Sequence, residues 1–323
     1  MERSGHTSDV FSLNLKNLTF KNHTDSIKGQ SPARKDKLCC WSYKNKLILF
    51  GGFGEAPEFS SNSSDFVFEV FNSLCWNNEL AVLDCTDHEN LKWEWPGKQG
   101  DFPCPRAAHA CTQIGGMGYM FGGRFKDDRR NDLYSLDLET YKWKLLHPAI
   151  VEAGDGQWTH TSVPCGRSWH VLAAASDHHL FLYGGFDTMG QALNDTWIYD
   201  LKSAIWSRLE NAALHLGLAS TRMWHTACPT DTPGHIVIFG GCENSLLTAA
   251  PIIHSNMISV FHFSPLSLQR LCLDAVMCNY GLCKGYLHFL PRSLQIKISH
   301  RSHALGFNND GEHGKLINSC AVM

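Results

Sequence analysis

The chain has 323 residues, 43% of them apolar and 18% charged, which excludes a wholly disordered protein and allows a large core. The net charge of −3 argues against a nucleic-acid-binding surface over the whole chain. No apolar run is as long as a transmembrane helix, and the polar start MERSGHTSDV does not resemble a signal peptide. The 13 cysteines include no Cys-x-x-Cys pair, so we expect reduced thiols, no zinc site and no cofactor.

The first 30 residues carry only fragments of a pattern that becomes regular further on. ERSGH (2–6) looks like the opening of one unit, and VFSLNLKNLTF (10–20) looks like the end of another. From residue 31 onward, four apolar runs each end in two glycines: LILFGG, GYMFGG, LFLYGG and IVIFGG. A glycine pair at the end of a buried strand allows a close backbone approach that a Cβ would prevent.

A second phrase follows each of the first three glycine pairs. It reads NNELAVLDCTDHENLKW (77–93), RNDLYSLDLETYKW (130–143) and LNDTWIYDLKSAIW (193–206). These short apolar runs between turn residues predict about four antiparallel strands in each unit. Such a unit cannot cover both of its faces alone and must pack on the next one, so the repeat predicts an all-β propeller built of blades.

A third phrase has the form Arg-x-x-His and occurs as PRAAH (105–109), GRSWH (166–170) and TRMWH (221–225). Its histidines, His109, His170 and His225, come from different blades, so we expect them to be buried and hydrogen-bonded to the backbone, with no metal bound. The two residues between Arg and His vary, and we expect them to face a ligand. Aligned on the phrase KDKL, Lys37 would share one ring with Trp169 and Trp224, while Arg124, next to a glycine pair, would lie in another.

The loop GGRFKDDRRNDL (122–133) concentrates cations, including Arg124, Arg129 and Arg130. One interpretation is a solvated turn in which arginine pairs with Asp127 or Asp128. The other is an anion pocket, because a guanidinium presents a planar fork that matches a carboxylate. The sequence leaves both interpretations open.

The pattern changes after the fourth glycine pair. SLQRLCLDAVMC (267–278) has apolar residues at helical spacing with Ser267 as N-cap, and LPRSLQIKI (290–298) follows it. The last segment reads as disordered and ends in Cys320-Ala-Val-Met, which matches a prenylation motif. Without a basic stretch a single lipid anchors weakly, so we expect a membrane association only if Cys320 is prenylated.

The glycine pairs, the Leu-Asp or Tyr-Asp phrase and the closing Trp together resemble the kelch-repeat family of β-propellers. Within that family the phrases KDKL, PRAAHAC, FGGR, GRSWH and WHTAC are similar to the substrate receptors of cullin-2 ubiquitin ligases. The resemblance implies a remnant of the first repeats at 1–30, a kelch propeller at 31–263, helical partner-binding motifs at 264–300 and a disordered tail at 301–323. The family has six repeats, whereas this chain has four and the remnants, which puts closure of the ring in question.

The resemblance implies a non-enzymatic receptor for protein C-termini ending in Gly-Gly. The residues carried over for the terminal carboxylate are Arg124, Arg129 and Ser168, and those for the pocket walls are Lys37, Phe53, Trp76, Trp169 and Trp224. At Phe53 the family has a tyrosine whose hydroxyl is expected to help bind the terminus, so ligand preference can differ here.

The C-terminal motifs resemble the two boxes with which such receptors join a ligase. Leu268, Cys272 and Val276 fit the box for Elongin C, and Leu290, Pro291, Leu294 and Ile298 fit the cullin-2 box. The resemblance implies that these apolar faces bind Elongin B–Elongin C and the cullin scaffold, promoting ubiquitination and degradation in the nucleus, the cytoplasm or both. Two alternatives remain: a kelch scaffold that has lost peptide binding with its missing blades, and an oxidase-like propeller enzyme, for which the sequence offers no metal-ligand set.

Overall fold

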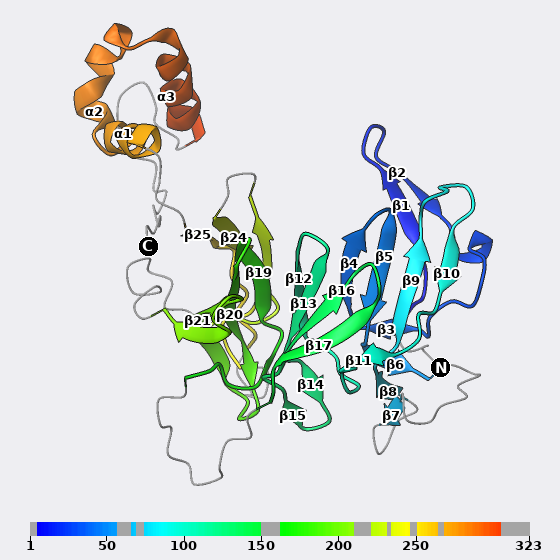
Figure 1. Cartoon of the computed structure of the whole chain (residues 1–323). Helices are drawn as coiled ribbons and strands as arrows, with labels where there is room; N and C mark the ends of the chain where they lie inside the picture. The colour runs from blue at the N-terminus through cyan, green and yellow to red at the C-terminus, as the bar shows by residue number, and fades with distance from the viewer. Residues whose placement is uncertain are drawn as a thin grey trace.

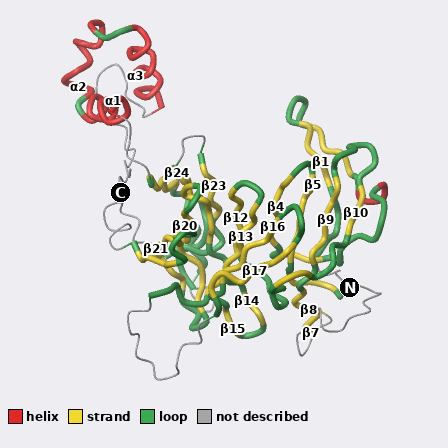
Figure 2. Tube along the Cα trace, in the orientation of Figure 1, coloured by secondary structure: helices red, strands yellow, loops and turns green. Residues whose placement is uncertain are grey.

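The computed structural model describes residues 5–56, 66–68, 74–149, 162–209, 221–230, 234–245, 251–263 and 268–304. The regular elements described up to His262 are strands joined by loops, apart from one 3-10 turn, and helices follow from Leu268 (Figures 1 and 2). Four antiparallel sheets, numbered here as blades 1 to 4, follow one another along the chain. The all-β class, the blades of antiparallel strands and the short helical C-terminal segment predicted from the sequence are confirmed.

Blades 1 and 2 have four strands each, ordered as they occur in the chain. Blade 1 consists of β4 (Cys39–Tyr43), β5 (Lys46–Phe50), β9 (Leu80–Asp84) and β10 (Lys92–Glu94). Blade 2 consists of β12 (Ala110–Ile114), β13 (Met117–Phe121), β16 (Leu133–Asp137) and β17 (Lys142–His147), with the short β11 (Gln99–Gly100) parallel to β17.

Blade 3 also has four strands, whereas three strands are described for blade 4. Blade 3 consists of β19 (Val171–Ser176), β20 (His179–Asp187), β21 (Ala192–Asp200) and β22 (Ile205–Arg208). Blade 4 consists of β23 (Thr226–Pro229), β24 (His235–Phe239) and β25 (Ile258–His262).

Short strands extend the blades at the ends where the glycine pairs lie. They are β3 (Lys35–Asp36), β6 (Phe53–Glu55), β7 (Phe66–Phe68), β8 (Leu74–Asn77), β14 (Arg124–Phe125), β15 (Asp128–Arg129) and β18 (Arg167–Ser168). Four non-glycine residues at these ends have positive φ, between 55° and 58°: Lys37, Ala108, Trp169 and Trp224. Ala108 N–H donates to the Lys37 carbonyl, Trp169 to Ala108 and Trp224 to Trp169 at 2.8–3.1 Å. We call these four the rim residues, and their hydrogen bonds link all four blades in order.

The first three glycine pairs each contact the backbone of the arginine in the next blade. The second glycine donates its N–H to that arginine's carbonyl: Gly52 to Arg106 at 2.9 Å, Gly123 to Arg167 at 2.9 Å and Gly185 to Arg222 at 2.7 Å. A Cβ on the first glycine would meet the same carbonyl oxygen at 2.8 Å for Gly51, 2.8 Å for Gly122 and 2.5 Å for Gly184. Glycine is therefore required there, for the close approach that the sequence predicts as well as for its positive φ.

Apolar side chains fill the space between consecutive blades. The cluster between blades 1 and 2 is built around Trp41, Phe50 and Trp143, and that between blades 2 and 3 around Phe121, Leu182 and Trp206. Between blades 3 and 4 the core contains Phe181, Tyr183, Ile236, Ile238 and Phe261. The core is thus a series of layers between sheets, as expected for stacked repeats.

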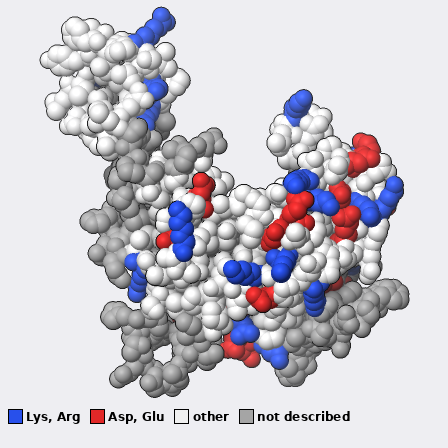
Figure 3. All heavy atoms as spheres, viewed as in Figure 1, with Lys and Arg blue, Asp and Glu red and all other residues white. Residues whose placement is uncertain are grey.

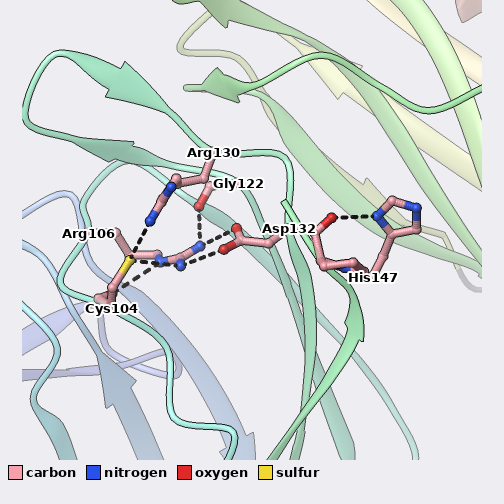
Figure 4. Close-up of polar contacts among 7 residues, drawn as sticks. Cys104, Arg106, Gly122, Arg130, Asp132 and His147 are labelled. Carbon is pink, nitrogen blue, oxygen red and sulfur yellow. Dashed lines mark hydrogen bonds and ion pairs between the residues drawn. The ribbon is translucent and has the colours of Figure 1, made fainter. Parts of the chain in front are cut away.

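The repeated arginines are buried and form ion pairs inside their own blades. Arg106 donates to both carboxylate oxygens of Asp132 at 2.6 and 2.9 Å and to the Gly122 carbonyl at 2.9 Å (Figure 4). Arg167 binds Asp195 in the same way at 2.7 and 2.8 Å. Burial alone would lower the pKa of Arg106, but the charge of Asp132 and its hydrogen bonds hold that pKa above the usual arginine value.

Blades 1 and 4 depart from this arginine–aspartate pair. In blade 1 the buried pair is Lys35 and Glu79, with Nζ and Oε2 2.6 Å apart. In blade 4, Arg222 is 1% exposed. Met257 precedes Ile258, the cross-strand partner of Phe239, and so occupies the position that Asp132 and Asp195 hold in blades 2 and 3. Arg222 reaches only the carbonyls of Gly240 and Met257, at 3.5 and 3.3 Å.

The repeated histidines are buried against the aromatic residue that precedes each glycine pair. The rings of His109, His170 and His225 meet those of Phe50, Phe121 and Tyr183 edge-on, with centroids 5.4–5.7 Å apart. The backbone of Phe121 and that of Tyr183 act on the buried rings of His170 and His225 as weak hydrogen-bond partners, in line with the predicted backbone contact. Their rings fill the space between adjacent blades. Burial lowers the pKa of His109 and of His225 to about 3.

Residues 10, 27 and 28 of the N-terminal segment contact blade 1. The hairpin of β1 (Phe11–Asn14) and β2 (Thr19–Asn22) exposes all eight of its strand residues. A 3-10 turn (Thr24–Ser26) follows it, and Val10 and Ile27, on either side, pack on the blade 1 cluster that includes Leu83 and Trp93.

The C-terminal helices are α1 (Leu268–Cys278), α2 (Tyr280–Cys283), the 3-10 helix η4 (Lys284–Phe289) and α3 (Arg292–Ala304). Helix α3 therefore includes four residues, 301–304, that the sequence predicts to be disordered. Leu273, Met277 and Ile298 form the small core between α1 and α3. No helix among the described residues is long and apolar enough to span a membrane.

We predict that Asp132→Ala lowers the free energy of unfolding by about 3–5 kcal/mol, because it leaves the buried Arg106 without its counter-charge. Urea denaturation measures the change. Glu139→Ala removes the exposed partner of Lys44 and should have no measurable effect. Equal loss of stability in the two variants would contradict the structural role of the buried pair.

We also predict an acid-sensitive stability that arises from the buried histidines. Their folded-state pKa is depressed, so the stability they contribute is present above the unfolded value of about 6.5 and is lost as pH falls toward the folded value of about 3. Lowering the pH from about 7 to about 5 should reduce the free energy of unfolding by roughly 2 kcal/mol through His225. His225→Phe should reduce the pH dependence measured by urea denaturation, whereas His88→Phe, at an exposed position, should leave it unchanged.

Candidate functional site

A small cavity of about 110 Å³ opens beside the rim residues of blades 1 to 3. It is lined by Lys37, Phe53, Trp76, Ala107, Ala108, Arg124 and Trp169. Its walls are aromatic: the Phe53 and Trp76 rings lie 4.9 Å apart, and the Arg124 guanidinium stands 5.6 Å from the centre of the Trp76 ring. The cavity thus combines flat apolar walls with a cation at one side.

Two arginines lie directly opposite each other on the β14–β15 hairpin. Arg124 and Arg129 are cross-strand partners, so their like charges face one another, an arrangement that disfavours the folded hairpin. The Nε of Arg124 donates to the Lys126 carbonyl at 2.7 Å. Burial, and then the charge of Arg124, lowers the pKa of Arg129. Along the described chain, neither guanidinium has a carboxylate within ion-pair distance, so the predicted alternative of pairing with Asp127 or Asp128 is not observed.

Ser168 connects this pair of cations to blade 3. It lies fully buried on β18, and its hydroxyl accepts a hydrogen bond from Arg129 Nε at 3.1 Å. The guanidinium of Arg129 lies 4.7 Å from the centre of the Phe186 ring. The aromatic ring and the hydroxyl hold Arg129 without neutralising it.

The rim supplies the remaining predicted wall residues. The Trp169 and Trp224 rings are 5.1 Å apart, and Trp224 is exposed. Lys37 binds its neighbour Asp36 at 2.7 Å and lies 5.7 Å from the centre of the Phe53 ring. As the repeats predict, Lys37, Trp169 and Trp224 occupy equivalent places, and Arg124 lies in a second set beside the glycine pairs.

The structure brings most of the predicted site residues together and adds others. Five predicted residues line the cavity, while Arg129, Ser168 and Trp224 each contact a lining residue or its strand partner. The additions are Ala107 and Ala108, whose place in the Arg-x-x-His phrase marks them as rim positions, and His6. The His6 ring meets Phe53 edge-on at 6.3 Å and its Nε2 lies 3.6 Å from Asp36, contacts for which the sequence gives no signal.

The predicted partner-binding residues of the C-terminal segment differ in exposure. Leu268 is 77% exposed, and Cys272 and Pro291 are also exposed. Val276 and Leu290 pack against the small helical core, and Leu294 is partly buried. Ile298 is 1% exposed, so the prediction of a free partner surface is wrong for this residue, which closes the core between α1 and α3. The possible prenylation site Cys320 lies outside the described residues.

In the visible face of the helical segment, most atoms belong to uncharged residues and the charged ones are Lys or Arg (Figure 3). Charged side chains of both signs gather instead over the blades, including the region of β14 and β15. In the residues the structure describes, no group of three His, Cys, Asp or Glu side chains is placed to hold a metal ion.

Comparison with known proteins identifies relatives of the chain along most of its length. The KLHDC2/KLHL20/DRC7 Kelch-repeats domain matches residues 1–148, and the Attractin/LZTR1 beta-propeller matches residues 77–266. Kelch domain-containing protein 2 of Bos taurus is 38% identical over 313 residues, which cover 94% of this chain and 71% of the relative. The Homo sapiens protein of that name is 39% identical with the same coverage, and human Kelch domain-containing protein 1 is 34% identical over 90% of this chain and 69% of the relative.

Proposed function

The chain belongs to the kelch-repeat family of β-propeller proteins, and on that premise we propose that it is the substrate-binding subunit of a cullin-2 ubiquitin ligase, with a pocket for protein C-termini that end in glycine. The observation that carries the proposal is the pair Arg124 and Arg129, two opposed cations without a carboxylate partner in the described chain, beside a small aromatic cavity.

A terminal carboxylate matches this pair of cations. Its two oxygens can accept from two guanidinium groups at once, and the anion relieves the repulsion between them. Arg129 is already oriented by Ser168 and the Phe186 ring, so little side-chain entropy is lost when it binds. Lys37, at the opposite wall, can bind a carbonyl of the peptide stem or a second acidic group.

The walls of the cavity favour a terminal residue without a side chain. Two alanines and three aromatic rings leave about 110 Å³. The rings of Phe53 and Trp76 pack on each other, and that of Trp169 packs on Phe186. A Cβ on the terminal residue would have to displace Trp76, which is buried, or the rim backbone at Ala108. Phe53 contributes an apolar wall here and no hydroxyl, so the peptide's polar groups depend on the cations and on Ser168.

The C-terminal helices supply the proposed link to the ligase. Leu268 and Cys272 project from the first turns of α1 into solvent, and an exposed leucine on an amphipathic helix suits a groove on Elongin C. The relatives are kelch-repeat proteins, and we propose for this chain a role in binding alone. Ubiquitin transfer would then belong to the ligase's other subunits, with Elongin B–Elongin C and the cullin scaffold as partners.

A kelch scaffold without peptide binding is the second candidate. It is favoured by the fourth blade, whose outer face is exposed at Phe239 and Ile258, since an incomplete ring can hold the rim residues less firmly. A chain that binds Elongin C and fails to bind any Gly-Gly-ended peptide would support this candidate.

We predict that Arg124→Ala and Arg129→Ala each weaken binding of a fluorescein-labelled peptide ending in Gly-Gly by about 10- to 150-fold. That range follows from the loss of one charge-assisted hydrogen bond. Fluorescence polarisation measures the affinity, and the same peptide with a C-terminal amide should bind about as weakly as the variants do. Lys126→Ala is the matched control, because only the backbone carbonyl of Lys126 contacts Arg124. Equal affinity for acid and amide would rule out carboxylate recognition.

We predict that Leu268→Ala reduces co-purification of Elongin B–Elongin C about 30-fold or more, as expected for an exposed anchor residue in a helix-binding groove. Leu282→Ala removes a side chain with nearly the same exposure, 79% against 77%, from the neighbouring helix and should leave co-purification unchanged. Loss of Elongin C in both variants would instead point to general damage to the helical segment.

A further inference from the structure

Two cysteines lie in the layer of side chains between blades 1 and 2. Cys39 is the first residue of β4, Cys111 is the second residue of β12, and these two strands lie side by side (Figure 1). Cys39 belongs to the buried cluster between the two blades, and Cys111 packs against the same cluster. Both are free thiols. They therefore share one layer although they are far apart in the chain.

The repeat shows that the positions of these two cysteines face each other. Cys39 comes two residues after the rim residue of blade 1, and Cys111 comes three residues after the rim residue of blade 2. The equivalent positions in the next two layers hold apolar pairs that each belong to one cluster: Ala110 with Leu172, and Val171 with Ala227. Among the three layers of the described chain, only the first has a thiol at both positions.

The contacts of each sulfur direct it toward the other blade. Cys39 Sγ lies 3.0 Å from Nε2 of His109, which belongs to blade 2. Cys111 Sγ donates to the Cys40 carbonyl of blade 1 at 3.5 Å. Burial above all, and then a hydrogen bond between the two thiols, raises the pKa of Cys39. Both side chains are thus turned into the layer that they share.

The two thiols differ in their access to solvent. Cys39 is 6% exposed, whereas Cys111 is partly exposed. A small oxidant therefore reaches Cys111 first, and the raised pKa of Cys39 makes direct oxidation of that thiol slow. An accessible cysteine with a protected one beside it is the arrangement in which a sulfenic acid condenses with a thiol to give a disulfide.

We propose that Cys39 and Cys111 form a site of reversible oxidation by hydrogen peroxide, at which a disulfide joins blades 1 and 2. Peroxide oxidises the Cys111 thiol to a sulfenic acid and is reduced, with release of one water. The Cys39 sulfur then attacks the Cys111 sulfur, so that the S–S bond forms and the S–O bond breaks. The departing hydroxide takes the proton of Cys39 and leaves as a second water.

Cys40 is the nearest competitor of Cys39. Side chains alternate along a strand, so the side chain of Cys40 leaves β4 on the face opposite to that of Cys39. Its thiol donates to the Trp41 carbonyl at 3.5 Å. A disulfide inside the layer between blades 1 and 2 therefore pairs Cys111 with Cys39, and Cys40 provides a matched control.

The disulfide would form close to the candidate cavity. Two residues that line this cavity, Lys37 and Ala108, shortly precede Cys39 and Cys111 in the chain. The Ala108 N–H already donates to the Lys37 carbonyl at 2.8 Å, so the two strands leave the rim together. A covalent bond at this place fixes blade 1 to blade 2, which carries Arg124.

Mass spectrometry of the full chain tests the proposal. The reduced protein is treated with hydrogen peroxide, its remaining thiols are blocked with N-ethylmaleimide, and it is digested with trypsin without a reducing agent. We expect the peptide 38–44 to be linked to the peptide 107–124, and dithiothreitol should separate them. Because the first peptide contains both Cys39 and Cys40, fragment ions that break the chain between these two residues assign the bond.

A pair of alanine variants separates the proposed site from random oxidation. Cys39→Ala introduces the residue that blade 2 has at the equivalent position, and the linked peptides should be lost; Cys40→Ala should leave their yield unchanged. In Cys39→Ala the sulfenic acid of Cys111 has no thiol partner, so dimedone should label Cys111 in this variant and not in the wild-type protein. A disulfide that joins Cys111 to Cys40, linked peptides in Cys39→Ala, or a Cys111 that peroxide leaves free in the wild-type protein would each overturn the proposal.

Discussion

The approach of an arginine carbonyl to the glycine pair of the preceding blade is the contact on which the rest of the fold depends. It sets the distance between sheets, because a Cβ at Gly51 or Gly122 would lie 2.8 Å from that oxygen. Once the carbonyl is placed, the arginine side chain turns back to the carboxylate of its own blade, and the histidine three residues later fills the joint. One backbone approach thus fixes an ion pair, an aromatic contact and the path of the rim.

The same contact between blades positions the residues of the candidate site. The residues between Arg and His carry no part of the ion pair or the ring contact, so they can vary, and their strained backbone holds them at the inner ends of the blades. The residue after a glycine pair is free in the same way, and Arg124 is one of these. A cavity assembled at the seam of three blades can therefore change its chemistry from blade to blade while the architecture stays the same.

The sequence predicts what repeats with the period of the blades and little else. The glycine pairs and the rim positions follow from that period, because equivalent residues must occupy equivalent places. The grouping of Arg124 with Trp76 and Trp169 was implied by the family resemblance alone. The Lys35–Glu79 pair was not predicted, since both residues depart from the consensus together. The repeat pattern does not predict that His6 contacts Phe53, or that Ile298 packs against α1. Each of these contacts joins two segments that share no sequence pattern.

Met257 affects which part of the protein unfolds first. Among the residues that the structure describes, buried Arg222 has no carboxylate like those that bind Arg106 and Arg167. The exposed Phe239 and Ile258 and the weakly bound Arg222 predict that amides of blade 4 exchange with solvent before those of blades 2 and 3. The residues that line the cavity belong to the other three blades. Local opening of blade 4 would therefore leave the candidate pocket folded, so the proposed binding of a ligand does not depend on the stability of the last blade.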